Sequence, residues 1–225
     1  DELDQLAPTL EVSRRARPKV GPPPAPASWP GAAAWIDELV GTLAEPQLAI
    51  VVGSHASGAR QLVDAAIRRC QLAEVASGRS TTPVIAGDLD AIAQQGGIEP
   101  FAIQSRDATR SFIERVVQAT AAVDGRVVIE LGTDRRATDT ISALARQPAH
   151  ATVVIVDQLE PVLARRRDFA IRHAPLLDVD EVGALAETML RTRPPQRWLA
   201  GLHAASEGMP LTAIELLRSI VDERD

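Results

Sequence analysis

Apolar residues between positions 31 and 160 follow two alternating patterns. One recurs at three- and four-residue steps and predicts amphipathic helices, within Ala32–Leu43, Leu62–Cys70, Phe112–Val117 and Ile141–Ala145. The other consists of short apolar runs that are typical of strands buried on both faces, at Leu48–Val52, Pro83–Ala86, Arg126–Leu131 and Thr152–Val156. This alternation predicts an α/β fold in which helices cover both faces of a parallel sheet.

Beyond His173 the pattern becomes purely helical, and we expect no further strand. Helical stripes run through Val182–Leu190, Trp198–Ala205 and Ile214–Val221. Gly208 and Pro210 stand where a helix terminator and a first-turn proline are expected. We therefore predict an α/β domain of residues 31–172 followed by a small helical subdomain of residues 173–225.

Residues 1–30 are predicted to form an N-terminal arm and linker. Prolines are frequent up to Pro30 and favour extended polyproline geometry over a packed element. The basic residues Arg14, Arg15, Arg17 and Lys19 suit contact with an acidic surface or a phosphate backbone, but short basic runs beside prolines are usually solvated. We favour a solvated tether.

Composition narrows the function classes. With 24 Lys and Arg against 30 Asp and Glu, the net charge of -6 argues against general nucleic-acid affinity. The single cysteine, Cys70, cannot form an internal disulfide, so we expect a reducing compartment and a cytoplasmic protein. No Cys/His spacing suits a metal, and no apolar run approaches the roughly 20 residues of a membrane helix. Because the first residue is not Met, the chain is treated as a possible fragment.

The loop after the first strand carries the most informative motif. It reads Gly53-Ser54-His55-Ala56-Ser57-Gly58-Ala59-Arg60 and matches both glycines of the phosphate-binding pattern G-x-x-x-x-G-K-[ST], between a strand and a helix. Ala59 replaces the phosphate-binding lysine, and Arg60 replaces the hydroxyl that binds magnesium. No lysine nearby substitutes, because Lys19 is the only lysine in the chain.

What the loop retains is a backbone whose N–H groups, backed by a helix N-terminus, attract an anion. Arg60 is a candidate cation, although a guanidinium does not simply replace an ammonium. Two interpretations stay open: a tight turn that binds nothing, or a loop that binds ATP or ADP without hydrolysis.

A second motif is incomplete as well. Hydrolytic sheets of this kind end another strand with an acid that holds magnesium, often followed by an acid that polarises water. Here Glu130 takes the first place and Leu131 the second. We therefore predict no catalytic residue, no metal site and no hydrolysis.

Taken in order, these stretches resemble the nucleotide-binding domain of the STAND group of the AAA+ superfamily, found in large bacterial transcription regulators of the MalT and LuxR kind. The stretch from His173 looks like the start of that family's lid, and Ser206–Leu217 is similar to its "EGNPL…EL" helix junction. By this resemblance Gly53 and Gly58 match the loop glycines, Glu130 replaces the magnesium-associated aspartate, and Pro210 matches the lid proline. Ala59, Arg60 and Leu131 depart from the pattern.

The resemblance implies an ATP- or ADP-binding switch that couples a sensor to an output such as a DNA-binding module. The leading hypothesis is a catalytically degenerate regulatory domain that acts through protein partners or self-association. The alternatives are a non-hydrolysing nucleotide switch and a noncatalytic scaffold subunit of an AAA+ assembly. No helix-turn-helix signature is present, so DNA binding requires a module outside this sequence, and we expect no membrane partner.

Overall fold

Five parallel strands form one sheet in the order β2-β3-β4-β1-β5. The strands are β1 (Leu48–Val52), β2 (Val84–Asp88), β3 (Arg126–Gly132), β4 (Thr152–Val156) and β5 (Ala170–His173). This computed structural model describes residues 24–25, 28–99, 105–146 and 150–222. The predicted parallel α/β fold is confirmed, and the four predicted strands are present with ends shifted by at most two residues.

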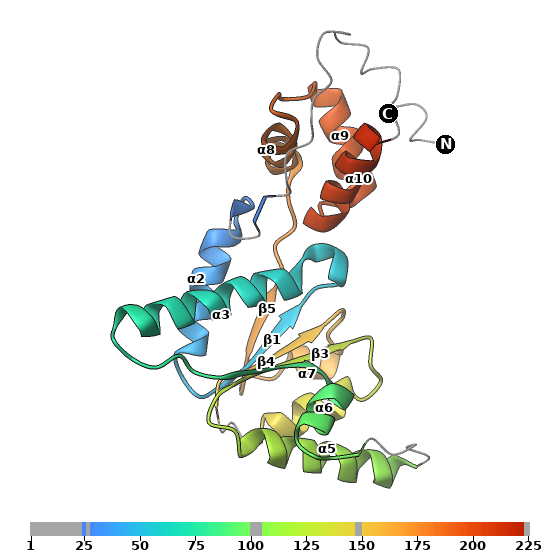
Figure 1. Ribbon diagram of the computed structural model, residues 1–225. Coiled ribbons are helices and arrows are strands. Elements are labelled where there is room, and N and C mark those ends of the chain that lie inside the picture. The colour runs from blue at the N-terminus through green and yellow to red at the C-terminus, as the bar shows by residue number, and fades with distance from the viewer. Residues whose placement is uncertain (1–23, 26–27, 100–104, 147–149, 223–225) are drawn as a thin grey trace. The chain divides into compact units, whose positions relative to one another are not determined.

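Helices cover both faces of the sheet (Figure 1). On one face lie α4 (Leu89–Gln95), α5 (Arg106–Ala121) and α6 (Ala137–Leu144), and on the other lie α2 (Ala32–Leu43) and α3 (Ala59–Ala76). Alternate residues of a strand point to opposite faces. Ile50, Ile129 and Val154 accordingly share one buried cluster with apolar residues of α4, α5 and α6. Because both faces are covered, the central strands are continuously apolar.

Three short elements were not expected from the sequence. β5 is an edge strand that pairs only with β1 among the described strands, and two of its four residues, Arg172 and His173, are polar. Arg172 forms an ion pair with Glu38 of α2. Helices α4 and α7 (Pro161–Ala164) are too short for their apolar spacing to show a period.

The C-terminal region consists of α8 (Val179–Leu190), α9 (Gln196–Ser206) and α10 (Pro210–Asp222). A capping box starts α8, because Asp178 accepts from the Glu181 backbone and Glu181 accepts from the Asp178 backbone. Trp198 is 2% exposed, and each of the three helices contributes further buried apolar residues. None of the helices described combines the length and apolarity that a membrane crossing needs.

The chain divides into two compact units. One contains Trp35–His55 and Ala59–Ala174, which includes the whole sheet. Of the described residues, the other contains 24–25, 28–34, the segment Ala56–Gly58, and 175–222. The predicted boundaries after residues 30 and 172 stay predictions, and the basic residues 14 to 19 lie outside the described residues.

Candidate functional site

The loop after β1 has the context that its motif requires. The Gly53 N–H donates to the carbonyl of Val156 at 2.9 Å, which ties the start of the loop to the end of β4. A short 3-10 turn, η3 (His55–Ser57), follows, and α3 begins at Ala59. Gly58 has a φ of +74°, a left-handed conformation that favours glycine. The loop therefore keeps the strand, turn and helix N-terminus of a phosphate-binding loop.

The two substituted positions of the motif lie side by side at the start of α3. Ala59 is 1% exposed and contributes no polar side-chain atom. Arg60 donates from Nε to Asp64 Oδ1 at 3.0 Å, and its Nη1 donates to Glu130 Oε1 in a short ion pair. The structure thus brings Arg60 and Glu130 together, although 70 residues separate them in the chain.

The two neighbouring carboxylates favour the charged form of the Arg60 guanidinium. Burial of its guanidinium opposes the charge, but the hydrogen bonds and negative charges of Asp64 and Glu130 outweigh it and raise the pKa of Arg60. One cation faces two carboxylates, so this cluster carries a net negative charge. In a magnesium-dependent phosphate-binding loop, the residue at this position and the acid of the neighbouring strand both serve the metal. Here a guanidinium joins the two positions directly.

Other carboxylates follow the carboxyl ends of the strands. Asp88 of β2 stands opposite Glu130 in the register of the sheet, and the Asp157 N–H donates to the Gly132 carbonyl at 3.1 Å. Asp88 is already engaged, because its side chain accepts from the Ala91 backbone and caps α4. Within the described ranges, no group of three or more acidic, His or Cys side chains could hold a metal ion.

A second arginine cluster, missed at the sequence level, lies beside these strand ends. Arg136 pairs with Asp134 at 2.6 Å and with Asp90 at 2.8 Å, and its guanidinium lies 5.6 Å from the centre of the Phe112 ring. The hydrogen bonds to Asp134 and Asp90 raise the pKa of Arg136. Burial favours the neutral form of Asp134, but the hydrogen bonds from Arg136 lower its pKa overall. The only local signal was the spacing of Asp134 and Arg136, since Asp90 is remote in the chain.

The remaining predicted site residues differ in exposure and in the unit to which they belong. His55 is exposed, Ser54 is half-buried and Ser57 is buried. Pro210 is the first residue of α10 and belongs to the helical unit. Leu131, which replaces the water-polarising acid, is 5% exposed.

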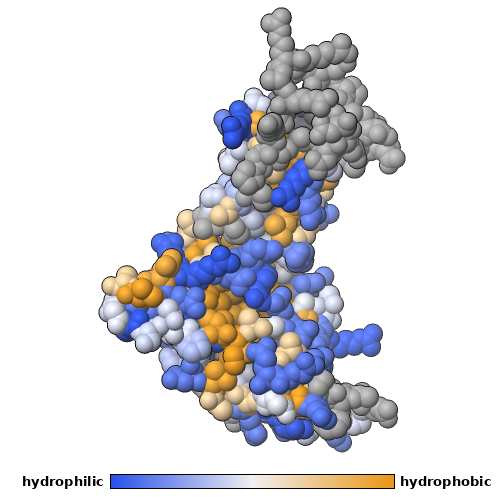
Figure 2. All heavy atoms as spheres, viewed as in Figure 1, coloured by the Kyte–Doolittle hydropathy of each residue, from blue (hydrophilic) through white to orange (hydrophobic). Residues whose placement is uncertain are grey.

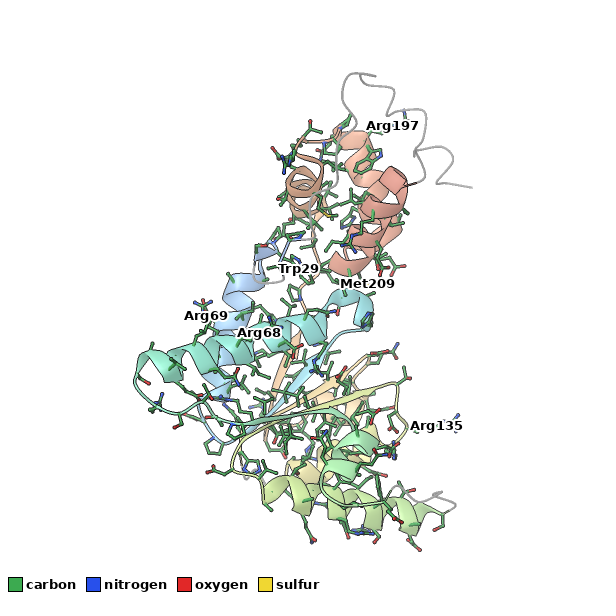
Figure 3. The ribbon with its side chains drawn as sticks, in the orientation of Figure 1. Trp29, Arg68, Arg69, Arg135, Arg197 and Met209 are labelled. Atoms are coloured by element: carbon green, nitrogen blue, oxygen red, sulfur yellow. The ribbon has the colours of Figure 1, made fainter. Side chains whose placement is uncertain are left out.

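Sequence reasoning also missed Trp29, the residue before Pro30 at the end of the predicted arm (Figure 3). Its side chain is 4% exposed. A Cβ added to Gly58 would lie 2.4 Å from Cζ3 and 2.6 Å from Cη2 of the Trp29 indole. The proline-rich setting concealed this contact, because proline favours an extended segment and says nothing of what a neighbouring tryptophan packs against.

Comparisons with known proteins identify the fold. The sequence matches no protein-family model and no curated protein. Among solved structures, the chain is similar to the ORC1 protein of Aeropyrum pernix in complex with DNA, with a TM-score of 0.61 and 21% identity over 94% of this chain. It is also similar, over its whole length, to Drosophila ORC bound to DNA, with a TM-score of 0.55 and 15% identity. The fold is that of an AAA+ P-loop NTPase domain.

The chain spans 65% of the length of the first of these proteins and 61% of the second. A weaker likeness, with a TM-score of 0.49 and 12% identity, is to a STAND protein with a tetratricopeptide repeat sensor from Pyrococcus horikoshii. It covers 95% of this chain and 34% of that protein. At these identities the likeness to the two ORC proteins establishes the fold alone and leaves activity to the residues of the site.

Proposed function

We propose that this chain is a regulatory AAA+-like domain that does not hydrolyse ATP and acts through contacts with protein partners or with copies of itself. The observation that carries the proposal is the position of the Arg60 guanidinium between Glu130 and Asp64. The Arg60 guanidinium neutralises the charge of Glu130, which stands where a hydrolytic site has the acid that holds magnesium.

Three features of the site oppose hydrolysis. The buried Ala59 has no cation for the terminal phosphates, and the charge of Arg60 is already matched by two carboxylates. Leu131 is apolar and cannot polarise an attacking water. Phosphoryl transfer depends almost entirely on positioned charges, so the loss of several together removes the basis for catalysis.

An exposed surface of α3 supports the role in protein contacts. Leu72 and Val75 are 70% and 59% exposed, and Arg68 precedes Leu72 by four residues, which places all three on one side of the helix. Figure 2 shows apolar side chains gathered at the end of α3, and Figure 3 marks Arg68 on the same helix. In sedimentation velocity we expect any concentration-dependent association that uses this face to weaken on Leu72→Glu.

We further propose that the output is transcriptional and passes through a DNA-binding module outside these 225 residues. Two similar proteins of known structure, the ORC1 protein and Drosophila ORC, were solved with DNA. The net charge of -6 disfavours broad DNA affinity in the chain itself.

Steady-state ATP turnover by purified protein tests the absence of hydrolysis. We expect no turnover above a buffer blank for the wild type. Arg60→Ala should behave the same, and Arg110→Ala is its matched control, because Arg110 also donates from Nε to the acid four residues later, Glu114. Sustained turnover that Glu130→Gln abolishes would refute the proposal.

A second candidate function is a non-hydrolysing ATP or ADP switch, which the retained loop backbone and the left-handed Gly58 favour. Calorimetric titration with each nucleotide, with and without magnesium, separates it from the first. Saturable binding that Arg60→Ala removes and Arg110→Ala preserves would establish the switch. No binding at millimolar nucleotide would eliminate it.

A further inference from the structure

Trp29 is held in place by its own segment. Its indole Nε1 donates to the carbonyl of Pro24 at 3.2 Å. Ser28 turns back on Ala25, whose carbonyl accepts from the Ser28 backbone at 2.8 Å and from the Ser28 hydroxyl at 2.7 Å. The Trp29 carbonyl then accepts from the Ala32 backbone, at the first residue of α2. A large aromatic ring is thereby fixed in a buried position by backbone acceptors of neighbouring residues.

The ring lies against the glycine of the loop. The distances of 2.4 and 2.6 Å from an added Gly58 Cβ mean that only a residue without a Cβ leaves room for the indole. Leu211 Cγ, in the first turn of α10, lies 3.7 Å from the same point. The segment Ala56–Gly58 belongs to the compact unit that contains Trp29 and Leu211. Residues from three stretches of one unit therefore lie together at Gly58.

This arrangement suits a planar bicyclic ring with a hydrogen-bond donor at its edge. Indole and purine are both flat fused systems of a five- and a six-membered ring, and the adenine of adenosine and ATP carries an N–H donor in its amino group. Gly58 lies against the indole ring, and the Pro24 carbonyl accepts from the edge of that ring. An engineered apolar cavity in a protein core can bind a free aromatic molecule that fits it.

We propose that the Trp29 indole fills a purine-sized site between the Pro24 carbonyl and Gly58, which we call the seat. The native domain then excludes free nucleotide from this seat until the indole leaves. The inference rests on the proposed function and deepens it, because it names a group of the chain itself that would compete with a nucleotide. Displacement of Trp29 by a partner opens the seat, and partner binding and purine binding are then coupled.

Calorimetric titration with adenosine and with ATP tests the seat in wild type, Trp29→Ala and Trp29→Phe. We expect Trp29→Ala to bind adenosine at least about tenfold more tightly than wild type, the factor for a seat open in at most about one molecule in ten. Trp29→Phe retains an aromatic occupant and should gain less. A folded Trp29→Ala that binds free indole but neither adenosine nor ATP would overturn the proposal.

A second variant keeps the inference testable if Trp29→Ala fails to fold. Gly58→Ala places a methyl group where the indole ring lies, so it should expel the indole and also leave too little room for a purine ring. Tryptophan emission should then shift to the red, and Trp29 accounts for the shift because Trp35 and Trp198 stay buried. Adenosine should bind this variant no more tightly than it binds wild type. Unchanged emission, or adenosine binding tighter than in wild type, would contradict the seat, as would wild-type nucleotide binding with Trp29 still shielded from a quencher. ATP turnover by wild type would instead refute the proposed function, so the two failures are distinguishable.

Discussion

Glu74→Ala should destabilise the protein strongly, because it leaves the buried Arg126 without its carboxylate partner. Glu74 Oε1 accepts from Arg126 Nη2 at 2.6 Å and from the Thr82 hydroxyl at 2.7 Å, and Glu74 Oε2 accepts from the Thr82 backbone at 2.8 Å. The two charged side chains are 9% and 11% exposed. Alanine removes all three interactions at once.

The magnitude follows from what Arg126 would have left. Its Nε and Nη1 are buried and have no partner among the described residues, so the bond from Nη2 to Glu74 is the main compensation for its charge. Breaking a buried ion pair from one side costs about 3–5 kcal/mol. At about 2–4 °C per kcal/mol for a protein of this size, the melting temperature should fall by roughly 6–20 °C.

Urea unfolding followed by circular dichroism measures this loss. Glu114→Ala is the matched control, because Glu114 also pairs with an arginine but both side chains are largely exposed, and it should cost less than about 0.5 kcal/mol. Replacing both partners, Glu74→Leu with Arg126→Met, should restore most of the stability, since no buried charge then remains. A loss below about 1 kcal/mol for Glu74→Ala would refute the reasoning.

Three further predictions concern pH, glycines and the thiol. The hydrogen bond from Arg126 lowers the pKa of Glu74 from 4.5 to about 2. The contribution of the ionised Glu74 to stability is therefore complete above pH 4.5 and is lost as the pH falls toward 2. The stability of Glu74→Gln should fall less steeply than that of wild type across this pH range. Gly41 is an exposed position of α2 where an added Cβ meets nothing within 4 Å, so Gly41→Ala should stabilise the protein by about 0.5–1 kcal/mol in a thermal melt. Gly208→Ala should lower the free energy of unfolding by at least about 1 kcal/mol, because φ is +71° and the new Cβ would lie 2.5 Å from the Leu177 carbonyl oxygen. Equal melting temperatures for Gly41→Ala and Gly208→Ala would contradict both predictions. Burial raises the pKa of the thiol of Cys70, the only cysteine in the sequence. Alkylation of Cys70 should therefore be slow in the native protein and fast in urea. Equal alkylation rates in the two conditions would show that the thiol is accessible in the native protein.

The candidate site was partly predictable. The spacing of Gly53 and Gly58 between a strand and a helix located the loop, and the absence of a lysine at Ala59 was visible in the sequence. The partners of Arg60 were not predictable in full. Asp64 lies one helical turn away, but Glu130 reaches Arg60 only because the sheet places β1 and β3 on either side of β4 and the long arginine side chain spans that distance.

The sequence by itself determined the α/β class and most element positions, because strands covered on both faces must be continuously apolar and helices covered on one face must be periodic. The tertiary structure decided what depends on pairing between distant segments. The edge strand β5 is too polar to show a pattern and forms because β1 offers it a ladder. Trp29 packs on Gly58, and Arg126 finds Glu74, through the folded chain. Such contacts depend on three-dimensional proximity, which local propensity and periodicity do not encode.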